Sequence, residues 1–82
     1  MIEFNNDAVG IVIRKLRLSK NMSQEVMSGL TGLARSHLSM IENGDKHPNL
    51  ETVWRIANTL EISPHELIEE IEKYISENES CI

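Results

Sequence analysis

The stretch Ser23–Gly44, SQEVMSGLTGLARSHLSMIENG, predicts two short helices joined by a tight turn. Ser23 suits an N-cap, because its hydroxyl oxygen accepts a backbone N–H of the first helical turn. Gly32 adopts a positive φ without a Cβ clash, so the chain turns sharply there. Gly44 suits the left-handed residue that follows the second helix.

The second helix of this stretch is expected over about residues 34–43. Ala34, Leu38 and Ile41 fall at i, i+4 and i+7, which predicts a buried stripe. The opposite face is mixed and mostly polar, as a surface that touches a partner would be. Two helices around a glycine-containing turn form the helix-turn-helix pattern, whose second helix enters the DNA major groove.

Longer pieces of the chain, SQE, RSHLSMIENG and PNLETVWRIANTLEISPHEL, make it resemble the Cro/C1 (XRE-type) repressor helix-turn-helix domain over about residues 8–72. The resemblance implies an all-α, compact five-helix bundle and a small single-domain transcriptional regulator that occupies residues 1–82. Three residues depart from the family pattern: Ser28 replaces the usual Ala, Gly29 weakens a helix, and Thr31 replaces a frequent apolar residue. We expect a loosely packed first helix of the motif.

The outward face of the second helix supplies the candidates for reading DNA bases: Arg35, Ser36, His37, Ser39 and Met40. Arg35 has a fork of donors that fits guanine O6 and N7, and a phosphate clamp is its equal alternative. Met40 suits contact with a thymine methyl group, or is simply a surface methionine.

Candidates for the DNA backbone flank that face: Ser23, Gln24, Asn43 and Lys46. Ser23 and Gln24 open a helix whose free N–H groups attract phosphate. The resemblance also assigns Gln24 to phosphate and to holding the reading side chains, and it assigns Asn43 and Lys46 to the flanking strand. It further implies an ion pair between Arg17 and Glu42, with DNA contact by Arg17 as the alternative.

The net charge of −5 is unusual for a DNA-binding protein, but its distribution is uneven. Residues 1–60 hold seven basic and six acidic side chains, whereas residues 61–82 hold one lysine and seven glutamates. The acidity therefore lies away from the proposed reading helix. We expect modest affinity from phosphate contacts, with a strong salt dependence.

Two further helices are expected around the motif. The first begins after Asn5 or Asn6 and ends near Lys20, and the fourth follows an Asn49 cap and ends near Leu60. We place Trp54 in the core rather than on the surface as a stacking platform. The expected inward residues are Val9, Val12, Ile13, Leu16, Leu50, Val53, Trp54, Ala57 and Leu60, with Ile11 and Leu18 filling space beside neighbouring helices.

The last helix is expected over residues 63–76, with Ser63 as N-cap, Pro64 at the first position and Glu66 completing a capping box. Its apolar stripe is long for a five-helix core. We favour a homodimer built from this helix and the end of the preceding one, with packing of the stripe against the first helix as the alternative. The interface residues of that prediction are Ile68, Ile71, Tyr74 and Ile75, and residues 77–82 are expected to fray.

Several function classes are disfavoured. The lone cysteine, Cys81, forms no internal disulfide and fits a reducing, cytoplasmic location. We see no leader segment and no run of apolar residues that would span a membrane. His37, His47 and His65 lack the spacing of a metal site. No phosphate-cradling glycine loop or catalytic triad is present, so we expect neither an enzyme nor a cofactor.

These features predict a sequence-specific DNA-binding regulator that binds a pseudo-palindromic double-stranded operator as a homodimer. The alternative is a helix-turn-helix fold that binds a protein partner, as an antitoxin or a regulator-binding protein would. The acidic last helix suits that alternative, whereas the reading face and its flanking residues favour DNA.

Overall fold

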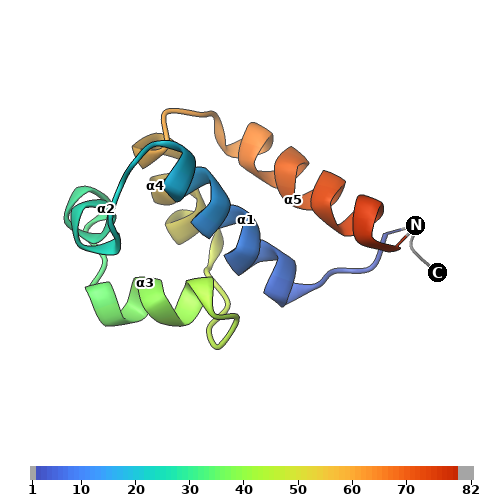
Figure 1. The fold of residues 1–82 in the computed structure, drawn as a ribbon, viewed down its shortest axis with the longest axis horizontal. Helices are drawn as coiled ribbons and strands as arrows, with labels where there is room; N and C mark the ends of the chain where they lie inside the picture. Colours follow the sequence, from blue (N-terminus) through green and yellow to red (C-terminus); the bar gives the residue numbers. More distant parts are fainter. Residues whose placement is uncertain (1, 80–82) are drawn as a thin grey trace.

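The computed structural model describes residues 2–79, and this part of the chain contains five helices and no strand. The helices are α1 (Asn6–Ser19), α2 (Gln24–Thr31), α3 (Arg35–Glu42), α4 (Leu50–Thr59) and α5 (Pro64–Glu79). Figure 1 shows α1 through the middle of the molecule, with α5 along one side of it and α3 along the other. The predicted all-α five-helix bundle is confirmed.

Side-chain caps define where three of the helices begin. Asn5, rather than Asn6, caps α1 by accepting the Asp7 amide at 2.9 Å. Ser23 caps α2 and Asn49 caps α4 in the same way. Each cap satisfies an N–H group that the helix itself leaves unpaired, so these starts are determined locally.

Residues with positive φ end or link the helices. Gly32 has a φ of 80° and Gly44 a φ of 83°, as their predicted turn roles require. Asn21 takes a φ of 55° after α1, and asparagine is the residue that tolerates this region best after glycine. Glu61 also has a φ of 61°, between α4 and α5, and nothing in its residue type indicated that.

The core lies between α1 and the other helices. It is formed by one apolar side of each helix, and Thr52 and Thr31 are buried at its edge. Arg17 and Glu42 are also buried. The most enclosed apolar side chains are Ile13, Met27, Leu38, Ile41, Ile56, Leu60 and Leu67.

Several residues predicted to face inward are exposed. Trp54 is 53% exposed and Leu50 is 71% exposed, so the core assignment of both was wrong. They lie one turn apart on α4, on a strip that flanks the side formed by the buried Val53, Ile56 and Ala57. The helical period allows only one side of α4 to meet α2 and α5.

Three further positions correct the sequence prediction. Ile11 and Leu18 remain exposed on α1 instead of filling space beside other helices. Ala34 is also exposed, because it lies just before α3 as its N-cap and is not part of the buried stripe. Leu38 and Ile41 alone form that stripe.

Helix α5 packs back against α1, the alternative considered for its apolar stripe. Ile71 is 7% exposed and Ile75 is 8% exposed within the single chain, so neither offers appreciable surface to a partner. Tyr74 is partly buried against the core, and Ile68 is exposed. The predicted interface residues are therefore largely used within the chain.

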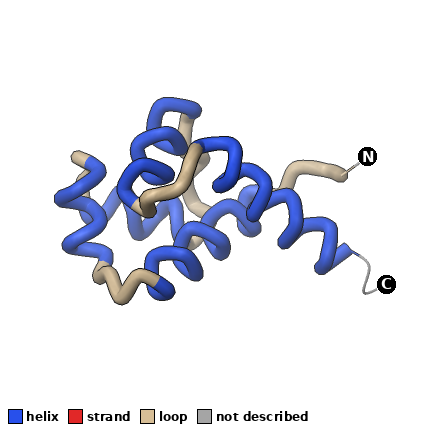
Figure 2. The backbone as a smooth tube through the Cα atoms, turned by 90° about the horizontal axis from the view of Figure 1, so that it is seen from above, coloured by secondary structure: helices blue, strands red, loops and turns tan. Residues whose placement is uncertain are grey.

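The end of α5 also differs from the prediction. The helix continues to Glu79, beyond the expected end at residue 76, and Figure 2 shows its last turns beside the N-terminal residues at one end of the molecule. Cys81 lies outside the described residues. At the other end of α5, the Glu66 carboxylate accepts hydrogen bonds from the hydroxyl and amide of Ser63.

Candidate nucleic-acid interface

The helix-turn-helix is formed by α2, the turn at residues 32–34, and α3. Gly32 and Leu33 both donate their amides to the Ser28 carbonyl oxygen, which closes the turn. Ser28 and Thr31 are buried between the helices, and both hydroxyls donate to backbone oxygens within α2. Two of the three departures from the family pattern are therefore satisfied polar groups, which a buried site requires. They need no looser packing.

The outward side of α3 presents the predicted reading residues. Arg35, Ser36 and Met40 are exposed, while His37 and Ser39 are half-buried beside them. Arg35 and Ser36 occupy the first turn of the helix, the part that reaches base edges when such a helix enters the major groove. In Figure 1, α3 forms the lower edge of the molecule, so this side is open to solvent.

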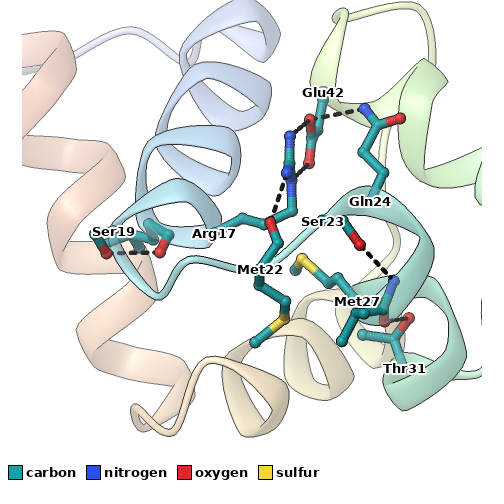
Figure 3. Close-up of polar contacts among 10 residues, drawn as sticks. Arg17, Ser19, Met22, Ser23, Gln24, Met27, Thr31 and Glu42 are labelled. Carbon is teal, nitrogen blue, oxygen red and sulfur yellow. Dashed lines mark hydrogen bonds and ion pairs between the residues drawn. The ribbon is translucent and has the colours of Figure 1, made fainter.

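A buried ion pair holds the end of α3 against α1. Arg17 Nε donates to Glu42 Oε2 at 2.7 Å, and Arg17 Nη2 donates to Glu42 Oε1 at 3.0 Å. The two side chains are 8% and 1% exposed, and Figure 3 shows them face to face. This is the pair that the family resemblance implies, and burial removes Arg17 from direct contact with DNA.

The same carboxylate ties the start of α2 to the end of α3. Gln24 Nε2 donates to Glu42 Oε1 at 3.0 Å, and Arg17 Nη1 donates to the Met22 carbonyl oxygen at 2.7 Å (Figure 3). Three helices, α1, α2 and α3, thus meet at one glutamate. An amide nitrogen has two N–H groups, so Gln24 retains a second donor for a phosphate.

The remaining backbone-contact candidates flank α3. Ser23 is exposed, and its hydroxyl oxygen already accepts the Val26 amide as the cap of α2. Asn43 is the C-cap of α3, and Lys46 lies in the loop that follows; both are exposed. The start of α2 also lies near this end of α3, because Gln24 donates to Glu42, the last residue of α3.

Two residues of α1 matter for this site although their roles were not predicted. Gly10 lies so close to α3 that a Cβ there would overlap the Ile41 and Glu42 carbonyl oxygens. Asn6 donates from its amide to the carbonyl oxygen of Gly44. A glycine in the middle of a helix, which is otherwise unfavourable, was the only signal in the sequence for either contact.

The acidic residues near the end of the chain lie away from α3, as their place in the sequence indicated. The acidic face of α5 lies across α1 from α3 (Figure 1), so it is remote from the reading helix. Among residues 2–79, no three histidine, cysteine or acidic side chains gather as a metal site would need. None of the described helices is long and apolar enough to cross a membrane.

The pKa of Glu66 is lowered, first by the hydrogen bond from the Ser63 hydroxyl and then by the hydrogen bond from the Ser63 amide.

Comparison with known proteins supports the identification of α2 and α3 as a helix-turn-helix. A helix-turn-helix family model matches residues 13–67. The chain is 36% identical over 61 residues to the control protein C.BamHI of Bacillus amyloliquefaciens, which covers 73% of this chain and 75% of that protein.

Two solved structures are similar. The restriction-modification controller protein C.AhdI of Aeromonas hydrophila superposes with a TM-score of 0.72 at 36% identity, over 74% of this chain and 92% of that one. The wild-type restriction-modification controller protein C.Esp1396I superposes with a TM-score of 0.83 at 31% identity, over 92% and 97%. The chain therefore belongs to the Cro/C1-type (XRE) helix-turn-helix family, a family of DNA-binding regulators and not an enzyme class.

Proposed function

We propose that this protein is a sequence-specific transcriptional regulator that places α3 in the major groove of a pseudo-palindromic operator and acts as a homodimer. The observation that carries the proposal is the exposed face of α3, held from behind by the buried Arg17–Glu42–Gln24 network. A reading helix must be rigid, because a base contact depends on the position of its side chain to a fraction of an ångström.

Within this proposal, the residues of α3 divide by their chemistry. Arg35 pairs with guanine or clamps a phosphate, Ser36 contacts either kind of base, and Met40 packs on a thymine methyl group. His37 and Ser39 lie at the edge of the footprint. Ser23, Gln24, Asn43 and Lys46 hold the phosphates, which gives affinity without sequence preference.

The dimer contact belongs on α4 in this proposal, because Ile71 and Ile75 are buried within the chain. Leu50 and Trp54 form an exposed apolar pair on α4, just after the loop that leaves the reading helix. Glu51 and Arg55 lie beside them and pair with each other at 3.1 Å.

The position of the dimer contact is tested by sedimentation of two charge variants. Leu50→Glu is expected to give monomers, because it places a carboxylate in the apolar contact between the two copies. Ile68→Glu, the matched control on α5, is expected to leave the dimer intact. The reverse result would move the contact to α5, and two monomeric variants would implicate both helices.

The function is tested by selecting random DNA duplexes with the purified protein at about 100 mM salt, followed by sequencing. We expect an enriched inverted repeat whose half-sites lie about one helical turn, roughly 34 Å, apart. A single enriched half-site would retain DNA binding and remove the obligate dimer. No enrichment, even at low salt, would favour the protein-interaction module instead.

The proposal extends to the class of genes that the protein regulates. Three of the similar proteins are named as control or controller proteins, two of them of restriction-modification systems. We extend that role to this chain as a proposal. Footprinting on the promoter of a restriction-modification operon from the source genome would test it, and protection confined to unrelated promoters would refute it.

A further inference from the structure

The side chain of Asn6 joins the start of α1 to the loop that follows α3. Its Nδ2 donates to the Gly44 carbonyl oxygen at 3.0 Å and to the Lys46 carbonyl oxygen at 3.4 Å. One amide thus holds the backbone on both sides of Asp45, across nearly half the length of the chain.

The orientation of this amide follows from its surroundings. Its other atom, Asn6 Oδ1, is buried and has no hydrogen-bond partner among the described residues. Turning the amide over would place that oxygen against two carbonyl oxygens, which would repel it. A buried acceptor without a partner is unfavourable. The favourable contribution of this side chain to the fold therefore comes from its two donated hydrogen bonds.

The loop is held from two other sides as well. Gly44 packs so closely on Asp7 that a Cβ there would overlap the carboxylate. The Met40 carbonyl oxygen accepts the amides of Asp45 at 2.9 Å and Lys46 at 3.3 Å. The backbone of residues 44–46 is therefore held by α1 and the last turn of α3, while Lys46 itself is exposed.

We propose that Asn6 is a positioning residue for DNA binding: it fixes the loop backbone from which Lys46 reaches a phosphate, without touching DNA itself. This inference rests on the proposed function. A lysine on a free loop would lose backbone and side-chain freedom when it binds, whereas a fixed loop leaves only the side chain to be ordered. The gain is independent of DNA sequence, because phosphates carry no sequence information.

The test is a double-mutant cycle between Asn6→Leu and Lys46→Ala, with binding measured on the selected operator and on a random duplex at several salt concentrations. Asn6→Leu removes both donors without changing the charge or the branching of the side chain. Asn78→Leu is the matched control, because Asn78 also donates its amide to a backbone oxygen, that of Tyr74 at 2.7 Å within α5.

We expect Lys46→Ala to weaken binding to both duplexes by the same factor and to lower the salt slope by about 0.9, the value for one phosphate. Asn6→Leu should weaken both duplexes by a smaller common factor. The double variant should bind within about twofold of Lys46→Ala alone, because Asn6 acts only by positioning a lysine that this variant already lacks. Asn78→Leu should bind as the wild type does.

A double variant that loses the product of the two single factors would overturn the inference, as would a change in the operator-to-random ratio for Asn6→Leu. A wild-type chain that binds no DNA would overturn the proposed function together with this inference. Melting curves show whether Asn6→Leu folds. Should it not fold, Asn6→Ser, whose side chain is too short to reach both carbonyls, takes its place in the same cycle.

Discussion

Removal of Arg17 should destabilise the fold far more than removal of an exposed arginine. In the variant Arg17→Met, the Glu42 carboxylate, which is 1% exposed in the wild-type chain, keeps only the Gln24 amide as a donor. Removing one partner of a buried pair costs about 3–5 kcal/mol, because the remaining charge is uncompensated. The Met22 carbonyl oxygen also loses its 2.7 Å bond.

That loss is large compared with the total stability. For 82 residues, about 0.05–0.15 kcal/mol per residue gives an unfolding free energy of roughly 4–12 kcal/mol. Urea denaturation followed by circular dichroism measures the difference between the variant and the wild type. We expect the midpoint to fall steeply, and a substantial unfolded fraction without urea if the wild type lies at the lower end.

Two further variants complete the test. Arg55→Ala breaks an ion pair at 3.1 Å whose side chains are 51% and 72% exposed, and we expect a change within about 0.5 kcal/mol. The double variant Arg17→Met/Glu42→Leu should recover much of the loss, because a buried pair is often replaced by apolar side chains without loss of stability. A loss below about 1 kcal/mol for Arg17→Met would refute the argument from burial.

Other predictions concern helix packing, pH and base reading. Gly29→Ala should raise the free energy of unfolding by up to about 1 kcal/mol, since a Cβ there meets nothing. Gly10→Ala should lower the free energy of unfolding, because its Cβ would overlap α3. Both are measured by urea denaturation, and a destabilised Gly29→Ala would contradict the packing of α2. The pKa of Glu66 is lowered in the folded state, so its bonds with Ser63 stabilise the fold above the unfolded-state pKa and are lost as the pH falls through the folded-state pKa. The melting-temperature difference between wild type and Glu66→Gln should therefore be largest near neutral pH and shrink in acid, and a constant difference would contradict this. Arg35→Ala should reduce the preference for operator over random DNA by about 1–3 kcal/mol in competition binding, and equal weakening on both would assign Arg35 to the backbone.

Local chemistry made some features predictable from the sequence. The caps at Asn5, Ser23 and Asn49 and the turns at Gly32 and Gly44 depend on side-chain and φ preferences within a few residues. These preferences act whatever the rest of the chain does. The exposed face of α3 was predictable for a similar reason, because Leu38 and Ile41 determine which side of a helix is buried.

Other features depend on which helices meet. Apolar side chains such as Leu50 and Trp54 look like core residues until the neighbours of α4 are known, since the helical period allows more than one apolar side. The same holds for Ile71 and Ile75, which are buried within the chain where α5 packs against α1 and α4.

The sequence by itself determined the helix-turn-helix, its caps and turns, and the candidate reading residues, because these follow from contacts within about ten residues. Only the tertiary structure decided that α5 folds back on α1, that Gly10 admits α3 at close range, and that Asn6 holds the loop of Lys46. Those contacts join residues far apart in the chain, so they depend on how whole helices pack and not on any local preference.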